Sequence, residues 1–175
     1  MAQDYTDLFV SGGANVDTLI TMLNALVASN TELKIAAMSG TAFNKTTSTT
    51  LSNVTGLTLA LESGGSYEID VYLQVTQDAT GGGKYALAYS GTSSYFISQF
   101  EVIAISGAGS IVAVDKQTLL GVACADQSTA TDVALHVRGF VTCTSAGDLT
   151  VQFAQNASSG TSSVLFGTLK TVKTN

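Results

Sequence analysis

Proline and tryptophan are absent from this sequence, and cysteine and histidine are nearly so. Without proline, the turns must depend on glycine, asparagine, aspartate and serine, and 17 glycines are available for them. The only soft or imidazole side chains are those of Cys124, His136 and Cys143, which do not make a convincing zinc site. We therefore expect neither a metal nor another cofactor.

Charge is also scarce. Charged residues make up 11% of the chain, and the net charge is −6. A chain this acidic has no basic stripe for phosphates, so we expect no nucleic-acid partner. No apolar run reaches the roughly eighteen residues that a membrane-spanning helix needs, so we expect no membrane partner. The low charge favours a surface covered by copies of the same chain or by another protein; the alternative is an ordinary β-domain with a hydroxyl-rich surface.

The stretch of residues 57–91 has the clearest pattern. From Tyr67 to Val75, large apolar residues alternate with Glu, Asp, Tyr and Gln, which is the period of a strand with one dry face and one wet face. Residues 57–61 and 84–89 alternate in the same way on either side of it. Because glycine-rich turns separate the three runs, we predict an antiparallel meander, the framework of a sandwich or a barrel.

Parts of this stretch resemble a known domain. The pattern Leu-x-Leu-x-x-Gly-x-x-Tyr-x-Ile-x-Val begins at Leu59, Asp-Ala-x-Gly-Gly-x-Lys begins at Asp78, and the next strand is followed by Gly91-Thr92. Together they resemble a recurrent domain of tailed-bacteriophage virion proteins, which occurs in capsid decoration proteins, head fibres and tail-fibre tips. The resemblance covers residues 57–92 and implies a small antiparallel jelly roll, commonly trimeric.

Further segments predict strands to the end of the chain, at residues 95–105, 111–114, 118–124, 132–144, 149–153 and 164–172. We expect residues 145–148, Ser-Ala-Gly-Asp, to form a hairpin turn between two of these strands. The whole pattern predicts an all-β fold, an antiparallel jelly-roll-like β-sandwich of about eight strands with one N-terminal α-helix. The strand order does not follow from the sequence.

Residues 1–40 differ in pattern from the rest. Residues 1–13 form a short arm, and residues 15–30 predict the one good helix, with a single apolar stripe. We interpret residues 1–40 as an anchor or oligomerisation region and residues 41–175 as the β-sandwich domain. The candidate contact residues are Tyr5, Leu8, Phe9, Val16, Leu19, Ile20, Leu23, Leu26 and Val27. The arm and the apolar stripe could instead pack on the β-domain of their own chain, since a helix this short needs packing contacts to be stable.

Catalytic chemistry is not expected. Nucleophilic catalysis needs a nucleophile, a base and an orienting acid in one place. Both cysteines fall in apolar runs, where a thiolate is disfavoured. His136 and Arg138 alternate with the apolar residues of 132–144, so they are neighbours on the second face of that strand. We interpret them as a solvated or interface pair.

The resemblance and the composition lead to one functional hypothesis. We expect a homotrimeric decoration protein that binds the major capsid protein on the outer surface of a phage virion and stabilises the head, after synthesis in the host cytoplasm. The alternative is a receptor- or carbohydrate-binding tip of a tail fibre. A cellular carbohydrate-binding module would normally carry exposed Trp or Tyr, and Trp is absent.

Overall fold

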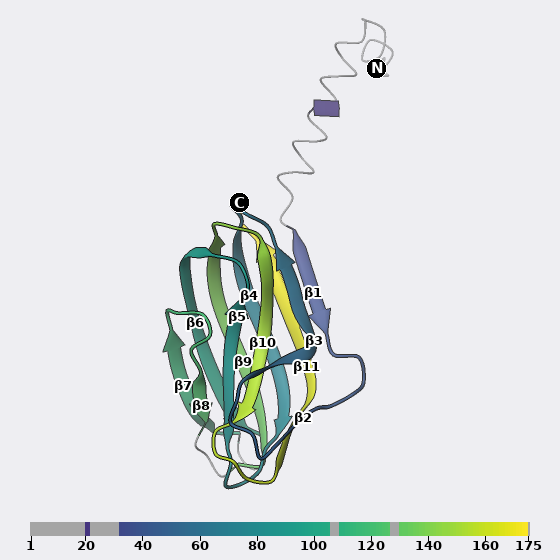
Figure 1. Cartoon of the computed structure of the whole chain (residues 1–175), viewed down its shortest axis with the longest axis vertical. Coiled ribbons are helices and arrows are strands. Elements are labelled where there is room, and N and C mark those ends of the chain that lie inside the picture. Colours follow the sequence, from purple (N-terminus) through teal and green to yellow (C-terminus); the bar gives the residue numbers. More distant parts are fainter. Residues whose placement is uncertain (1–19, 22–31, 106–108, 127–129, 175) are drawn as a thin grey trace, which may run out of the picture. The chain divides into compact units, whose positions relative to one another are not determined.

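The computed structural model describes residues 20–21, 32–105, 109–126 and 130–174. Contacts divide the chain into two units, Met1–Thr31 and Glu32–Asn175. In the second unit the described residues form strands (Figure 1). The strands are β1 (Leu33–Ala37), β2 (Phe43–Thr46), β3 (Ser52–Leu61), β4 (Ser66–Thr76), β5 (Gly83–Tyr89), β6 (Ser93–Ala104), β7 (Ile111–Gln117), β8 (Cys124–Asp126), β9 (Asp132–Cys143), β10 (Gly147–Gln155) and β11 (Thr161–Lys173).

Two antiparallel sheets form a sandwich, which confirms the predicted all-β class. The seven-stranded sheet has the order β1-β11-β4-β9-β6-β7, with β2 also paired to β11, and the four-stranded sheet has the order β3-β10-β5-β8. The eight strands from β3 to β10 are divided between the two sheets. One sheet contains β4-β9-β6-β7 and the other β3-β10-β5-β8, which is a jelly-roll-like arrangement. Strands β1, β2 and β11 widen the larger sheet beyond the eight strands expected.

The predicted meander over residues 57–91 is wrong. Strand β3 pairs with β10, β4 pairs with β11 and β9, and β5 pairs with β10 and β8, so consecutive strands lie in different sheets. The predicted hairpin at residues 145–148 is wrong for the same reason, because β9 and β10 also belong to different sheets. Alternation determines which face a side chain takes, but it carries no information about the neighbouring strand.

The strand predicted at residues 118–124 is also wrong. The chain bends and turns from Thr118 to Gly121, and only Cys124 enters a strand, β8. Gly121 has a φ of +77°, a left-handed conformation that favours glycine and interrupts an extended run. Leu119 is consequently 67% exposed. The run was apolar but did not alternate, so its composition was a poor guide to a strand.

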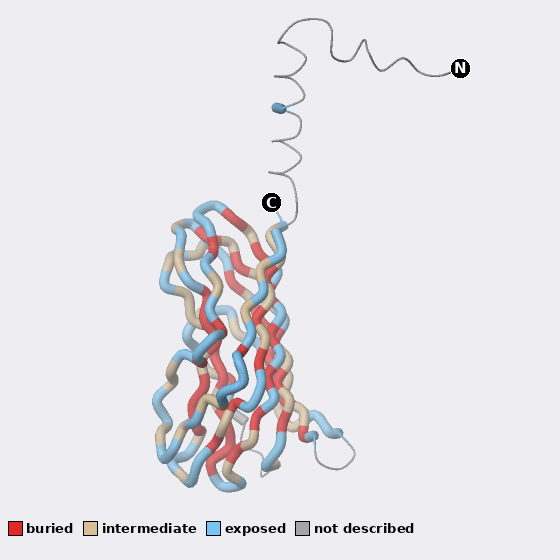
Figure 2. Tube along the Cα trace, turned by 90° about the vertical axis from the view of Figure 1, so that its right-hand side faces the viewer, coloured by how far each residue is buried: buried red, intermediate tan, exposed pale blue. Residues whose placement is uncertain are grey.

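The hydrophobic core lies between the two sheets. In β4, the side chains of Tyr67, Val71, Leu73 and Val75 are fully buried while their sequence neighbours point outward, as predicted. Buried positions also alternate with less buried ones along β6 and most of β9, and Figure 2 shows buried positions along the strands of both sheets. The predicted inward face of β9 is confirmed as well, at Val133, Leu135, Val137, Val141 and Cys143.

A glycine allows β3 to lie close to β1, at the edge of the larger sheet. Gly56 has a φ of +86° and interrupts the alternation of β3, so that Val54 and Leu57 are both buried. A Cβ atom at Gly56 would lie 3.2 Å from the carbonyl oxygen of Ala37, the last residue of β1. The close approach of these two strands therefore depends on the missing side chain.

The first strand begins earlier than the boundary expected at residue 41. Strand β1 pairs along its whole length with β11, from Leu33 opposite Val172 to Ala37 opposite Thr168. Of the helix predicted at residues 15–30, only Ile20 and Thr21 are described, and both are helical. The arm and the rest of that helix lie outside the described residues. In the described part of the chain, no helix has the length and apolarity to cross a membrane.

Candidate functional site

The side of the seven-stranded sheet that is turned away from the four-stranded sheet, called here the outer face, carries a line of polar side chains. Lys170 of β11 lies opposite Asp70 of β4, and Asp70 lies opposite Arg138 of β9. Arg138 lies opposite Gln99 of β6, and Gln99 lies opposite Lys116 of β7. These residues form one row across five neighbouring strands, which we call the polar row.

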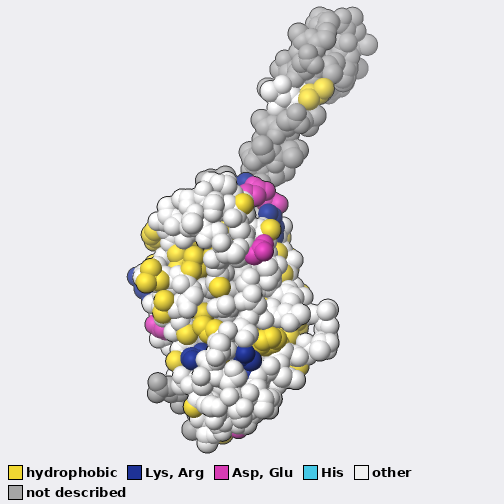
Figure 3. Space-filling model, in the orientation of Figure 1, with side chains coloured by type: hydrophobic (Ala, Val, Ile, Leu, Met, Phe, Trp, Pro, Cys, Tyr) yellow, Lys and Arg dark blue, Asp and Glu magenta, His cyan; other side chains and the backbone are white. Residues whose placement is uncertain are grey.

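The polar row holds an unusual share of the basic side chains. All 7 Lys and Arg residues of the chain are described, and Lys34, Lys45 and Lys173 donate to a neighbouring carboxylate or hydroxyl oxygen. Among the described residues, the others form no ion pair; they are Lys84, Lys116, Arg138 and Lys170. Lys116, Arg138 and Lys170 all belong to the polar row, so cations outnumber the single carboxylate of Asp70 in it. On the face of the molecule seen in Figure 3, charged side chains are few.

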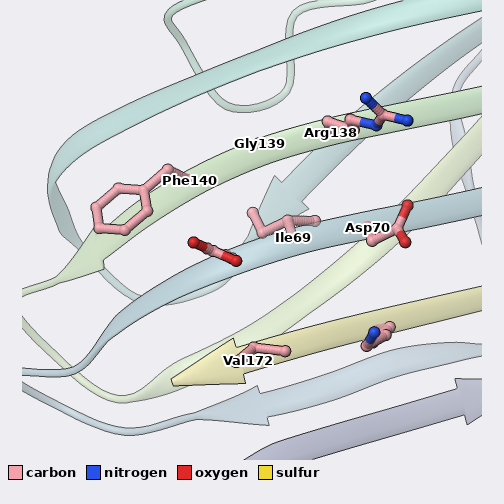
Figure 4. A pocket seen from close by; sticks show the side chains of 8 residues that line it. Ile69, Asp70, Arg138, Gly139, Phe140 and Val172 are labelled. Carbon is pink, nitrogen blue, oxygen red and sulfur yellow. The ribbon is translucent and has the colours of Figure 1, made fainter. Parts of the chain in front are cut away.

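Two hollows open on opposite sides of β9, and Arg138 lines both. The first has a volume of about 450 Å³ and is lined by Glu68, Ile69, Asp70, Arg138, Gly139, Phe140, Lys170 and Val172 (Figure 4). The second, of about 430 Å³, is lined by Ile97, Ser98, Gln99, Lys116, Arg138 and Gly139. Both volumes fall in the usual range for small-ligand sites.

The two hollows differ in chemistry. The first combines two carboxylates, two cations and the apolar side chains of Phe140 and Val172. The described lining of the second contains two cations and the Gln99 amide but no carboxylate. The second hollow therefore suits an anion, whereas the first suits a polar group without net charge.

His136 and Arg138 share the outer face of β9, as predicted. The Nε2 atom of His136 lies 2.7 Å from Oδ1 of Asp70, on the neighbouring strand β4. The sequence did not indicate this partner, because it did not show that β4 and β9 are neighbours. His136 and Arg138 both border a small third hollow with Gln99 and Glu101.

The cysteine thiols are separated from the histidine by the sheet itself. Cys124 and Cys143 are each 1% exposed and are not joined to each other. Cys143 points into the core from β9, while His136 points outward from the same strand. The described part of the chain thus brings no thiol to the imidazole, and it contains no group of three metal-ligating side chains.

The carboxyl groups with shifted pKa values belong to turns. Hydrogen bonds from the hydroxyl and the amide of Thr80 lower the pKa of Asp78, which closes the turn after β4. A hydrogen bond from Lys173, 2.7 Å away, lowers the pKa of Glu62 in the turn after β3. Burial raises the pKa of the Tyr89 hydroxyl, which donates to the carbonyl oxygen of Ser145 at 2.6 Å. These contacts hold turns in place.

Exposed apolar side chains gather at one edge of the outer face. On β1, Leu33 and Ile35 are 53% and 60% exposed, and on β4 Tyr72 is 42% exposed. An irregularity in the pairing of β11 lies between Val164 and Phe166, and it leaves Leu165 and Phe166 both exposed. The rings of Tyr72 and Phe166 are 6.5 Å apart. We call Leu33, Ile35, Tyr72, Leu165 and Phe166 the apolar flank.

The contact residues expected from the sequence fall almost wholly elsewhere. Ile20 is described and is 48% exposed. The others lie outside the described residues; they are Tyr5, Leu8, Phe9, Val16, Leu19, Leu23, Leu26 and Val27. Sequence reasoning missed the apolar flank. Leu33 and Ile35 alternate with smaller or charged residues, but this alternation does not reveal that their side of the strand faces outward.

Fold and surface together define a jelly-roll-like β-sandwich with a mixed polar and apolar outer face. No family model and no curated protein matches the chain. A chain in the structure of the infectious bursal disease virus Gx strain is similar with 9% identity and a TM-score of 0.24, over 82% of this chain and 40% of that one. For the VP2 subviral particle of the same virus, the identity is 10%, the TM-score 0.24 and the coverage 83% and 42%. The chain thus spans less than half the length of these structures, and a similarity this weak assigns neither family nor function.

Proposed function

We propose that the protein is a structural component of a tailed-phage particle, a homotrimeric decoration protein that binds the major capsid protein from outside and stabilises the head. The observation that supports this proposal is the apolar flank. It begins at β1, directly after residues 1–31, in which the candidate contact residues lie. Several exposed large apolar side chains on one face, of which Tyr72 and Phe166 have ring centroids 6.5 Å apart, mark an interaction surface rather than a site of chemistry.

Stabilisation follows from burial of surface. Each trimer bridges several capsid subunits, so that expansion or rupture of the shell has to break its contacts. A specific contact buries on the order of 800 Å² of each partner, and burial of apolar surface contributes about 25 cal/mol per Å². Three equivalent contacts on one trimer add avidity beyond that of a single contact.

A second candidate function is the receptor- or carbohydrate-binding tip of a tail fibre. The two hollows beside Arg138 favour it, because they have the size of small-ligand sites. The two functions differ in which part of the outer face makes the essential contact.

The experiment combines light scattering with capsid binding. At micromolar concentration the full chain should have three times the chain mass of 17.9 kDa, and it should sediment with capsids that lack it. Replacing Ile35 and Phe166 by serine should weaken trimer formation or capsid binding. Leu119→Ser is the matched control, because Leu119 is 67% exposed but lies between β7 and β8. A monomer that does not bind capsids, or equal losses in both variants, contradicts the proposal.

A further inference from the structure

The hollow between β9 and β7 has the donors of a carboxylate site. Arg138 and Lys116 stand on strands two positions apart, with Gln99 between them. Neighbouring strands are about 4.8 Å apart, so the two long side chains start roughly 10 Å from each other and can reach one anion above Gln99. A guanidinium offers two parallel N–H donors to a carboxylate, and an ammonium adds a point charge.

The hollow between β9 and β11 suits a neutral sugar ring. Glu68 and Asp70 supply hydrogen-bond acceptors, Lys170 supplies donors, and Phe140 supplies an apolar surface (Figure 4). The Phe140 ring lies 6.2 Å from that of Tyr95, which is 52% exposed. Convergent polar groups beside an aromatic surface match the hydroxyl groups and the apolar face of a sugar. The two carboxylates make this hollow unfavourable for a second anion.

The two hollows are adjacent, since both are lined by Arg138 and by Gly139. Adjacent hollows of similar volume fit neighbouring units of one chain that crosses β9. We propose that this part of the outer face binds an acidic oligosaccharide, with a carboxylated sugar between Arg138 and Lys116 and a neutral sugar beside Phe140. The proposal holds for a decoration protein and for a fibre tip alike, because it concerns a different part of the face from the apolar flank.

An acidic polypeptide is the competing ligand. It would satisfy the hollow of Arg138 and Lys116 equally well. A run of acidic side chains would, however, bring a second carboxylate towards Glu68 and Asp70 in the adjacent hollow. The combination of one basic hollow and one neutral hollow therefore favours a chain in which charged and neutral units alternate.

The test measures binding of a tetrasaccharide of alternating glucuronic acid and N-acetylglucosamine to the isotope-labelled full chain. We expect shifted amide signals in β9, β6 and β7, and weaker binding at 500 mM than at 50 mM salt. Arg138→Ala and Lys116→Ala should each weaken binding about tenfold, because each removes a charge-assisted contact. Lys84→Ala is the matched control, since Lys84 also forms no ion pair in the described part but lies on β5 of the other sheet.

Further binding measurements can overturn the proposal. Chitotetraose, which is neutral and of equal length, should bind at least about tenfold more weakly; equal affinity contradicts the carboxylate site. If penta-glutamate binds as tightly and with the same dependence on Arg138, the site belongs to an acidic polypeptide. Absence of tetrasaccharide binding, or an equal loss in Lys84→Ala, rejects the site. If Arg138→Ala does not fold, Lys116→Ala decides alone.

Discussion

Val71 and Asp70 are neighbours in β4 with opposite environments. Val71 is fully buried between the sheets, whereas Asp70 faces outward and is paired with His136 at a distance of 2.7 Å. The contrast arises because successive side chains of a strand point to opposite faces. At this scale a single substitution tests which face of β4 belongs to the core.

Val71→Ala should lower the free energy of unfolding by about 1.5–3 kcal/mol, because it removes buried methyl groups and leaves a cavity. Asp70→Ala should cost less, since its contact with His136 is exposed to solvent and exposed polar contacts of this kind contribute about 0–1 kcal/mol. Urea unfolding of both variants measures the order. If Asp70→Ala is the more destabilised protein, the faces of β4 are assigned the wrong way round.

Gln155 is a buried polar residue that ties loops together at one end of the sandwich. It is 0% exposed, and its Oε1 atom accepts a hydrogen bond from the Ser48 amide at 2.9 Å. Its Nε2 atom donates to the carbonyl oxygens of Ser159 and Gly160. The loop after β2 and the loop before β11 are therefore held to the end of β10.

Gln155→Ala should destabilise the protein by about 1–3 kcal/mol, because it empties a buried position and leaves the partly buried amide of Ser48 and the carbonyl oxygens without their partner. Gln152→Ala, on the same strand, is the control. Gln152 has one exposed side-chain hydrogen bond, to Asn53 at 2.9 Å, so its loss should change the midpoint of urea unfolding little. An equal shift of the unfolding midpoint in Gln155→Ala and Gln152→Ala would contradict the stabilising role of the buried Gln155 side chain.

Among the elements, β3, β4, β5, β9 and β10 show what could be predicted and what could not. Their existence, their approximate bounds and their buried faces follow from the alternation of large apolar residues. Their pairing does not, because in a jelly roll the chain crosses between the sheets after β3, β4 and β9. A turn rich in glycine fits a crossing as well as a hairpin, so the sequence suggested a meander that the structure lacks.

The candidate site was predictable only in part for the same physical reason. His136 and Arg138 were placed together because they are on one strand. Asp70, Gln99, Lys116 and Lys170 join them from four other strands, through cross-strand register that no single segment encodes. The outward position of Leu33 and Ile35 was likewise hidden, since an edge strand can turn either side to the core.

The turn after β3 is held to the end of β11 by an ion pair. Lys173 Nζ lies 2.7 Å from Glu62 Oε2, and this contact lowers the pKa of Glu62 and raises that of Lys173 from their ordinary values. A lowered carboxyl pKa stabilises the fold at higher pH and is lost as pH falls through the folded value. A raised ammonium pKa stabilises the fold at lower pH and is lost as pH rises through the folded value.

Glu62→Gln should therefore lower the midpoint of urea unfolding slightly at pH 7. The difference from the unchanged protein should shrink as the pH falls through the lowered pKa of Glu62, because the carboxyl group is then protonated in the folded state as well. It should also shrink as the pH rises through the raised pKa of Lys173, because the folded protein then loses the ammonium charge. Urea series across this pH range check the pattern, and a difference that does not change with pH contradicts the ion pair as its cause.

Two shortened chains, one with β1 and one without it, test how much β1 contributes to stability. A chain beginning at Glu32 keeps all the strands that the structure describes, including the pairing of β1 with β11, so it should fold. A chain beginning at Thr41 lacks the pairing of β1 with β11 and also lacks Met38, which is 8% exposed in the core. It should fold but be less stable. Equal midpoints for both shortened chains would show that β1 contributes nothing measurable to the sheet.

At the scale of the whole sandwich, the buried core between the sheets contrasts with the outer face of the larger sheet. The core places no thiol beside the histidine in the described residues, and the outer face carries the apolar flank and the polar row. In the proposed function, residues 1–40 and the flank make the contacts of a trimer. The position of this trimer in the particle separates capsid decoration from a role at the tip of a tail fibre.

Electron cryo-microscopy of the intact particle measures that position directly. We predict density for three copies of the β-sandwich around a three-fold axis on the outer surface of the head, in contact with several copies of the major capsid protein. The apolar flank should lie at a contact between subunits. Density for the sandwich at the tip of a tail fibre, or single copies on the head with the flank in solvent, would contradict the account.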